Sequence, residues 1–260
     1  MLKILKYSFY DLIRSRWSYV YFIFYLVMGF LLLFLNNDVS KAVITLMNII
    51  IVLVPLIGTI FGVMYYYNSK EFTELLLAQP IKRSSIFLGQ YLGVAGSLTM
   101  SLVLGLGIPF VLYGLFKSDA IFDFTLLLVT GASLTLIFTA LSFNIALSNE
   151  NKIKGFGYAV LLWLFMAVIY DGLFLMSLIL FEEYPLDSFS LFATMLNPID
   201  LSRTLILLKL DISALLGYTG AVFKSFFGTK LGYTVSMVLL MTWVILPIWR
   251  LVHISKKKDF

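Results

Sequence analysis

Six apolar runs constrain this chain more than any other feature of its sequence. A helix of about 20 apolar residues spans the hydrocarbon core of a bilayer, and runs of at least this order cover 17–35, 42–66, 90–116, 124–147, 156–181 and 231–252. A soluble domain could not bury this much apolar surface, because 61% of the residues are hydrophobic and only 13% are charged. We therefore predict an all-α polytopic membrane protein with six transmembrane helices in one domain, 1–260.

The residue types that are missing exclude several chemistries. Cysteine is absent and His253 is the single histidine, so disulfides, thiolate metal sites and histidine-assisted nucleophiles are excluded. The ten methionines are scattered without Met-x-x-Met pairs, and we interpret them as core filling rather than a copper site. No Walker A sequence occurs, so any ATP must be bound by another chain. We expect no enzyme activity, no bound cofactor or metal, and no nucleic-acid partner.

The distribution of basic residues predicts the orientation in the membrane. Six spans place both termini on one side, and the loops on that side are richer in Lys and Arg, which is typical of the cytoplasmic face. The basic residues of that side are Lys3, Lys6, Arg14, Arg16, Lys70, Lys82, Arg83, Lys152, Lys154, Arg250 and Lys256 to Lys258, against Lys41, Lys117, Arg203, Lys209, Lys224 and Lys230 opposite.

The outer segment 182–230 contains an oily stretch, 197–228, that could be taken for a seventh span. A seventh span would carry the basic C-terminal tail to the outer face, against the charge bias of the other loops. It would also bury Lys209 and Asp211 near its centre, at about 2.5–3.5 kcal/mol each. We therefore predict a helical segment that lies on the outer leaflet or dips into it.

Local signals within this outer segment predict where its helices begin and break. Asn197 and Pro198 are suited to the N-cap and the first residue of a helix. Asp200 and Arg203, three residues apart, could then pair on the wet side of that helix. A break at 217–220, with the sequence Gly-Tyr-Thr-Gly, would separate it from a second short helix.

Two short amphipathic segments lie on the predicted cytoplasmic side. Residues 1–16 place Leu2, Leu5, Phe9, Leu12 and Ile13 on one helical face, as expected of a helix lying on the membrane and contacting its lipids. The loop 67–89 has a short helical signal that Pro80 stops. Spacing alone leaves two interpretations of each segment. Residues 1–16 form a lipid anchor or a structural elbow, and the loop 67–89 forms a solvated turn or a contact site.

The loop sequence "KEFTELLLAQPIKRSSIFLGQ" resembles the first cytoplasmic loop of ABC-2 type transporter permeases. The resemblance implies the ABC-2 permease fold, an N-terminal elbow helix, and a coupling helix that seats in an ATPase subunit carrying ATP and Mg. The usual glycine and threonine after the first glutamate are replaced by Phe72 and Thr73. The coupling residues that the resemblance implies are Glu71, Glu74, Leu75, Leu76, Leu77, Gln79, Pro80 and Arg83.

The outer stretch "LNPIDLSRTLILLKLDISALLGYTGAVFKSFFG" is similar to the NosY family of ABC-2 permeases. The resemblance implies a homodimer in the bacterial inner membrane, with a NosF-like ATPase inside and a NosD-like periplasmic repeat protein outside, acting in copper-site maturation of nitrous oxide reductase during denitrification. The matched residues, implied to form a segment for the periplasmic partner or a gate, are Asn197, Pro198, Asp200, Arg203, Asp211, Gly217, Tyr218, Thr219, Gly220, Ala221, Val222 and Phe223.

Some questions stay open at this point. Asp171 is the one acid within the expected spans, and it is either a functional group or a structural acid that finds a partner inside the protein. Three functions remain: a permease for nitrous oxide reductase maturation, an ABC-2 exporter of another cargo such as a lipid, drug or polysaccharide, or a membrane scaffold that transports nothing.

Overall fold

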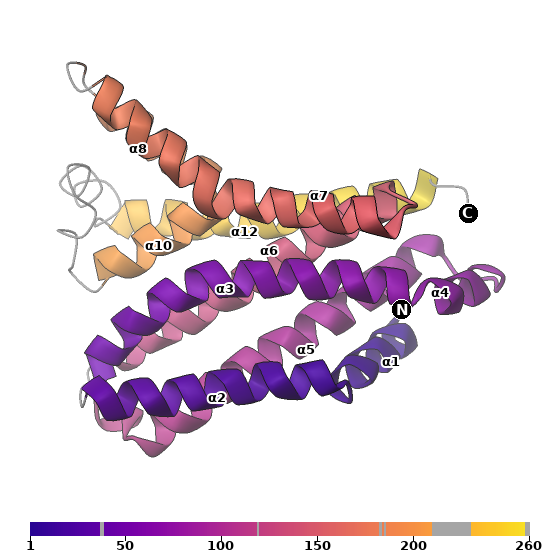
Figure 1. Ribbon diagram of the computed structural model, residues 1–260, viewed down its shortest axis with the longest axis horizontal. Coiled ribbons are helices and arrows are strands. Elements are labelled where there is room, and N and C mark those ends of the chain that lie inside the picture. Colours follow the sequence, from indigo (N-terminus) through magenta and orange to yellow (C-terminus); the bar gives the residue numbers. More distant parts are fainter. Residues whose placement is uncertain (37–38, 119, 182–183, 185, 210–229, 258–260) are drawn as a thin grey trace.

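The computed structural model describes residues 1–36, 39–118, 120–181, 184, 186–209 and 230–257, and no β-strand occurs among them. Figure 1 shows a bundle of long helices with shorter helices at both ends. Six of the helices are long and apolar enough to span a membrane, so the prediction of an all-α, six-span chain is confirmed at this level. They are α2 (Arg16–Asn36), α3 (Val39–Asn68), α5 (Arg83–Leu112), α6 (Ile121–Ser148), the continuous helix 152–180, and α12 (Lys230–Lys257).

The third of these helices begins earlier and ends earlier than the expected span 90–116. Lys82 is extended and acts as the N-cap, so α5 begins at Arg83 immediately after the turn at Pro80. At the other end Gly114 has φ 91°, a left-handed conformation that ends the helix and starts the 3₁₀ turn η1 (Leu115–Lys117). The loop 67–89 is therefore shorter than expected and contains α4 (Lys70–Leu77).

The N-terminal helix α1 (Leu2–Ile13) packs on α5 through a face that overlaps the predicted apolar one. Its buried residues are Ile4, Ser8 and Leu12, and of the predicted face Leu12 is buried, Leu5, Phe9 and Ile13 are half-buried, and Leu2 is 79% exposed. Glycines of α5 allow this close contact, because a Cβ at Gly93 would lie 2.6 Å from the Ser8 Cβ. Small residues in one helix let a second helix approach closely at those points.

Small residues also allow close packing between α3 and α6. A Cβ at Gly58 would lie 3.3 Å from the Thr139 Oγ1, and a Cβ at Gly62 would overlap the Ser142 hydroxyl. The Thr139 hydroxyl donates to the Gly58 carbonyl over 3.4 Å. Glycines thus let α6 approach α3 closely, as they let α1 approach α5.

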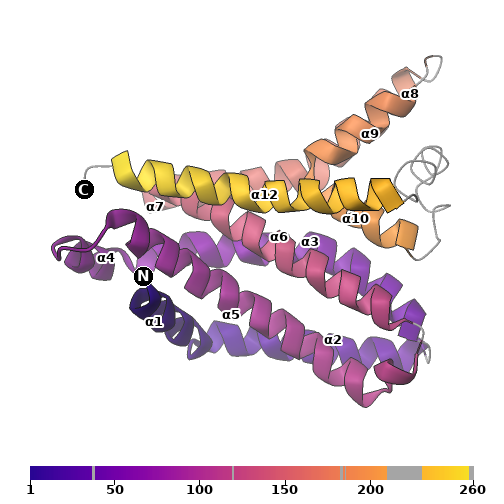
Figure 2. The ribbon, with the colours of Figure 1, turned by 180° about the vertical axis from the view of Figure 1, so that it is seen from behind.

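Both ends of the chain lie at one end of the bundle. Figures 1 and 2 show α1, α4 and the last turns of α12 at that end. The connection from α6 to α7 is there too, and the Tyr67 hydroxyl fixes it by donating to the Asn149 carbonyl over 2.7 Å. This common placement is the one that six spans require.

The fifth span is interrupted at its middle. It consists of α7 (Lys152–Leu164), a π-helical turn η2 (Phe165–Ile169) and α8 (Tyr170–Leu180). Figure 1 shows that α8 diverges from the bundle beyond this turn. Such a bulge changes the helix direction and is frequent at functional sites.

A helical hairpin connects the fifth span to the sixth. Helix α9 (Asp187–Leu196) returns beside α8, where the Tyr170 hydroxyl donates to the Ala193 carbonyl over 2.6 Å. Helix α10 (Pro198–Lys209) then reverses direction and packs against α3, α6 and α12. Figure 2 shows α10 lying along α12.

Candidate functional site

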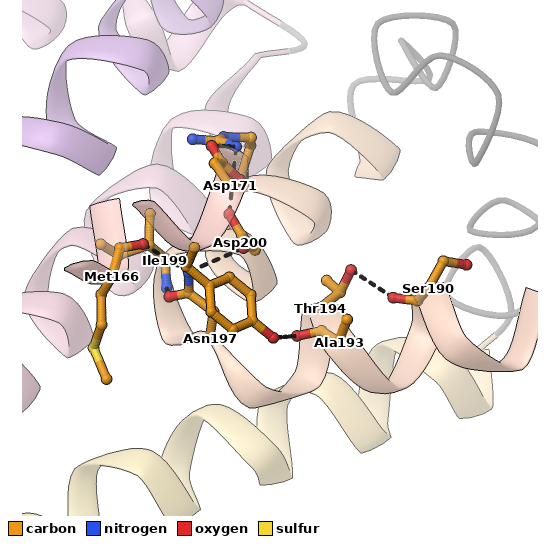
Figure 3. A network of polar contacts seen from close by, with 10 residues as sticks. Met166, Asp171, Ser190, Ala193, Thr194, Asn197, Ile199 and Asp200 are labelled. Atoms are coloured by element: carbon orange, nitrogen blue, oxygen red, sulfur yellow. Dashed lines mark hydrogen bonds and ion pairs between the residues drawn. The ribbon is translucent and has the colours of Figure 1, made fainter. Parts of the chain in front are cut away.

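Asn197 forms the tip of the hairpin and joins it to the π-helical turn. Its Oδ1 accepts from the Ile199 amide over 3.0 Å, so the predicted N-cap is confirmed. Its Nδ2 donates to the Met166 carbonyl over 2.8 Å and to Asp200 Oδ2 over 3.0 Å (Figure 3). Met166 lies at the middle of the 152–180 helix, so the hairpin returns to the mid-depth of the fifth span.

A basic residue of α10 bridges two acids that are far apart in sequence. Arg203 Nη1 lies 2.7 Å from Asp171 Oδ2 and 3.3 Å from Asp200 Oδ1. The Asp200 side chain is only 8% exposed, whereas those of Asp171 and Arg203 are 28% and 29% exposed. A single guanidinium charge therefore faces two carboxyl groups in an apolar environment.

This arrangement changes the protonation of Asp200. Burial, followed by the charge of Asp171 and a hydrogen bond with it, raises the pKa of the Asp200 carboxyl from 3.8 to about 8, although Arg203 and Asn197 oppose the shift. Around neutral pH Asp200 therefore favours its protonated form. A protonated Asp200 leaves one charge fewer removed from water, which is less costly.

The site corrects one expectation and answers another. The expectation that Asp200 and Arg203 pair on a wet helix face is wrong in its setting: they do pair, but Asp200 is 6% exposed and α10 is buried against three spans. Asp171 has a partner inside the protein, namely Arg203. Sequence spacing could not reveal this contact, because 32 residues separate the two positions.

Further hydrogen bonds within the hairpin and from α12 hold the hairpin in place. The Trp243 indole of α12 donates to the Met195 carbonyl over 3.2 Å. The Thr194 hydroxyl donates to the Ser190 carbonyl within α9 over 2.9 Å, as Figure 3 shows. The hairpin is thus bonded to both neighbouring spans, α8 and α12.

The other outer residues of the predicted site are not placed by the structure. The predicted break at 217–220 and the second short helix lie outside the described residues. The same holds for Asp211, Gly217, Tyr218, Thr219, Gly220 and Phe223.

At the opposite end of the bundle, α4 presents most of the predicted coupling residues to the surface. Glu71, Glu74 and Leu75 are exposed, and the Lys70–Glu74 pair at 3.8 Å is exposed on both sides. Gln79, Pro80 and Arg83 are exposed as well, whereas Leu76 and Leu77 are half-buried.

The two residues that follow the first glutamate, Phe72 and Thr73, attach α4 to the bundle. The Thr73 hydroxyl accepts from Gln90 Nε2 of α5 over 2.8 Å, and both residues are buried. The Phe72 ring stacks on the Tyr7 ring of α1, with centroids 4.6 Å apart. The inner side of α4 is therefore fixed while its outer side is free to contact another molecule.

Comparison with known proteins adds no identity. The chain matches no known protein-family model, and no curated protein is significantly similar to it in sequence. Within the described part of the chain, no three His, Cys, Asp or Glu residues gather in a way that could hold a metal ion. The site is thus defined by its ion pairs and hydrogen bonds alone.

Removing the bridging arginine should destabilise the protein. Arg203→Met would leave Asp171 and Asp200 facing each other without a cation, and we expect a loss on the order of 2 kcal/mol, less than for a fully buried pair because the arginine is partly exposed. The loss should shrink in an Asp171→Asn background. The free energy of unfolding in detergent is measured for the single and the double variant. Arg250→Met, at an exposed position, is the control. Strictly additive effects would contradict the bridge.

Protonation of Asp200 should make stability depend on pH. Because folding raises this pKa, the folded state binds more protons than the unfolded state between pH 3.8 and about 8. The stabilisation that the proton on Asp200 gives the folded state is therefore complete below pH 3.8 and is lost as the pH rises through about 8. Asp200→Asn should flatten this part of the stability profile, whereas the exposed Glu150→Gln should not. An Asp200→Asn profile that parallels the parent would contradict the assignment.

Proposed function

We propose that this chain is the membrane-spanning subunit of an ATP-driven ABC-2 type transporter, and that α4 contacts its ATPase partner. The observation that carries the proposal is the asymmetry of α4. A buried hydrogen bond at Thr73 and a ring contact at Phe72 fix its inner side, while Glu71, Glu74 and Leu75 are exposed on a loop between two long apolar helices. The basic residues gathered at this end of the chain favour a cytoplasmic location for it.

The contacts of α4 suggest how a displacement would enter the membrane. Gln90 lies in α5, which also packs on α1, α2 and α6. A push on the outer side of α4 would thus reach α5 through a short, buried hydrogen bond, and α1 through the stacked Phe72–Tyr7 pair. Closely packed helices move as rigid bodies more readily than they deform.

The narrower form of the proposal is a permease of the NosY type. It would act as a homodimer in the bacterial inner membrane with a NosF-like ATPase and a NosD-like periplasmic repeat protein, and would support copper-site maturation of nitrous oxide reductase. Its support is the sequence likeness around Asn197–Pro198, which forms the hairpin tip. In this form the outer segment contacts the periplasmic partner.

One observation favours a second candidate, an ABC-2 exporter of another cargo. Asp200 and Arg203 belong to the residues that resemble the NosY family, yet both are engaged inside the protein rather than presented outward. They have a structural reason to be present whatever the hairpin contacts. Co-purification of a periplasmic repeat protein with the chain would favour the first candidate over the second.

Charge reversal on α4 tests the ATPase contact. Glu71→Lys together with Glu74→Lys should greatly reduce co-purification of the ATPase subunit and the stimulation of its ATPase activity. Both acids are exposed, and lysines in their place would repel a partner surface that accepts acids. Lys256→Glu, an exposed reversal at the same end of the molecule, is the control and should have a small effect.

Gln90→Leu tests transmission separately from contact. It removes the bond to Thr73 without altering the exposed side of α4, so the ATPase should still bind while its stimulation by the membrane subunit falls. Unchanged ATPase binding and stimulation in the α4 reversal would refute the assigned contact. Unchanged stimulation in Gln90→Leu alone would refute the route through α5.

A further inference from the structure

A cavity of about 540 Å³ lies where α1, the end of α3 and α4 meet. Its size falls within the usual range of small-molecule sites. It is distant in sequence from the hairpin site, and none of the residues of the hairpin site lines it. Figures 1 and 2 place these three elements together at the end that carries both termini.

The walls of the cavity are mainly aromatic and apolar. Tyr7 and Phe72 form a stacked pair on one side, and Phe61 and Met64 of α3 contribute apolar surface. Trp17, at the start of α2, is 65% exposed. Exposed tryptophan at the start of a spanning helix is typical of the interface between lipid tails and head groups.

The polar residues of the cavity wall include one carboxylate, and the others, Ser15, Asn68, Ser69 and two tyrosines, carry hydroxyl or amide groups. Asp11 is the only ionisable acid or base among its lining residues, and it lies one helical turn after Tyr7, so both are on the same face of α1. A carboxylate flanked by aromatic faces attracts an organic cation, by charge and by cation–π contact.

A buried hydroxyl in the same wall lacks a partner. Tyr65 lines the cavity and is 7% exposed, and its hydroxyl lies near the Ser8 hydroxyl and the Asp11 carboxylate but makes no hydrogen bond of good geometry within the described residues. A buried, unpaired hydroxyl is costly and calls for an explanation. A bound molecule with a polar head could supply the missing bond.

We propose that this cavity binds an amphiphile with a protonated amine head group, its ammonium near Asp11 and its apolar tail along the aromatic wall. Two sources have this chemistry: an aminophospholipid of the facing leaflet and a free long-chain amine. A lipid with an anionic head is disfavoured, because the cavity offers it a carboxylate and no base among the lining residues.

The first experiment measures lipid selectivity. The full-length protein is reconstituted in vesicles of equal phosphatidylethanolamine and phosphatidylglycerol with identical acyl chains, extracted mildly, and the retained lipid is quantified. We expect phosphatidylethanolamine to be retained in clear excess. Asp11→Asn should lower that excess about tenfold, the size of effect expected for loss of one charge-assisted hydrogen bond. Glu150→Gln, an exposed acid outside the cavity, should leave it unchanged.

Two further variants separate binding from folding. Tyr65→Phe removes the unpaired hydroxyl, so it should leave the thermal stability of the delipidated protein unchanged or higher while weakening retention. Met64→Trp fills the cavity from a residue that is 37% exposed and should also abolish retention. Equal retention of the two lipids together with no binding of dodecylammonium, or retention indifferent to Asp11→Asn, Tyr65→Phe and Met64→Trp, would overturn the assignment.

Dodecylammonium distinguishes the two sources. Its displacement of phosphatidylethanolamine, with no displacement by dodecanol, would support a common site for the ammonium group. Retention of the lipid without competition by dodecylammonium would assign the cavity to the aminophospholipid. Binding of dodecylammonium without lipid selectivity would assign it to free amines, provided that Asp11→Asn weakens it. None of these readouts involves an ATPase, so they are independent of the proposed transport function.

Discussion

One arginine between two acids holds the α9–α10 hairpin against the fifth span. Charges removed from water are tolerated when they are paired, and Arg203 meets Asp171 of α8 and Asp200 of its own helix within 3.3 Å. Because Asp200 is buried and a second carboxylate lies beside it, Asp200 favours its protonated form. The depth of the hairpin follows from this set, together with the bond from Asn197 to the Met166 carbonyl.

The rest of the bundle places this site and α4 at opposite ends of shared helices. Helix α3 contacts α10 and is followed directly by α4. Glycines in α3 and α5 bring α6 and α1 close, so the spans between the two ends are tightly packed. In the proposed transporter, a displacement of α4 would therefore be carried by helices that also contact the hairpin.

The sequence predicted those features that depend on local pattern. The six apolar runs correspond to six long helices, and Asn197 and Pro198 form a capped helix start. Contacts between distant segments escaped prediction: the Arg203–Asp171 pair and the return of α9 both depend on how helices meet. From the local sequence alone, the charges on α10 indicate exposure, because Asp171, which pairs with Arg203, lies elsewhere in the chain.

The depth of the hairpin is the central claim, and cysteine labelling tests it directly because the chain has no native cysteine. Leu196, beside the hairpin tip, and Tyr184, in the turn before α9, are both exposed on the protein surface, at 49% and 64%. In membranes, Tyr184→Cys should react with a membrane-impermeant maleimide, whereas Leu196→Cys should not, because it faces lipid at the depth of Met166. Equal labelling of the two cysteines in intact membranes, with a folded protein, would contradict a hairpin that enters the membrane.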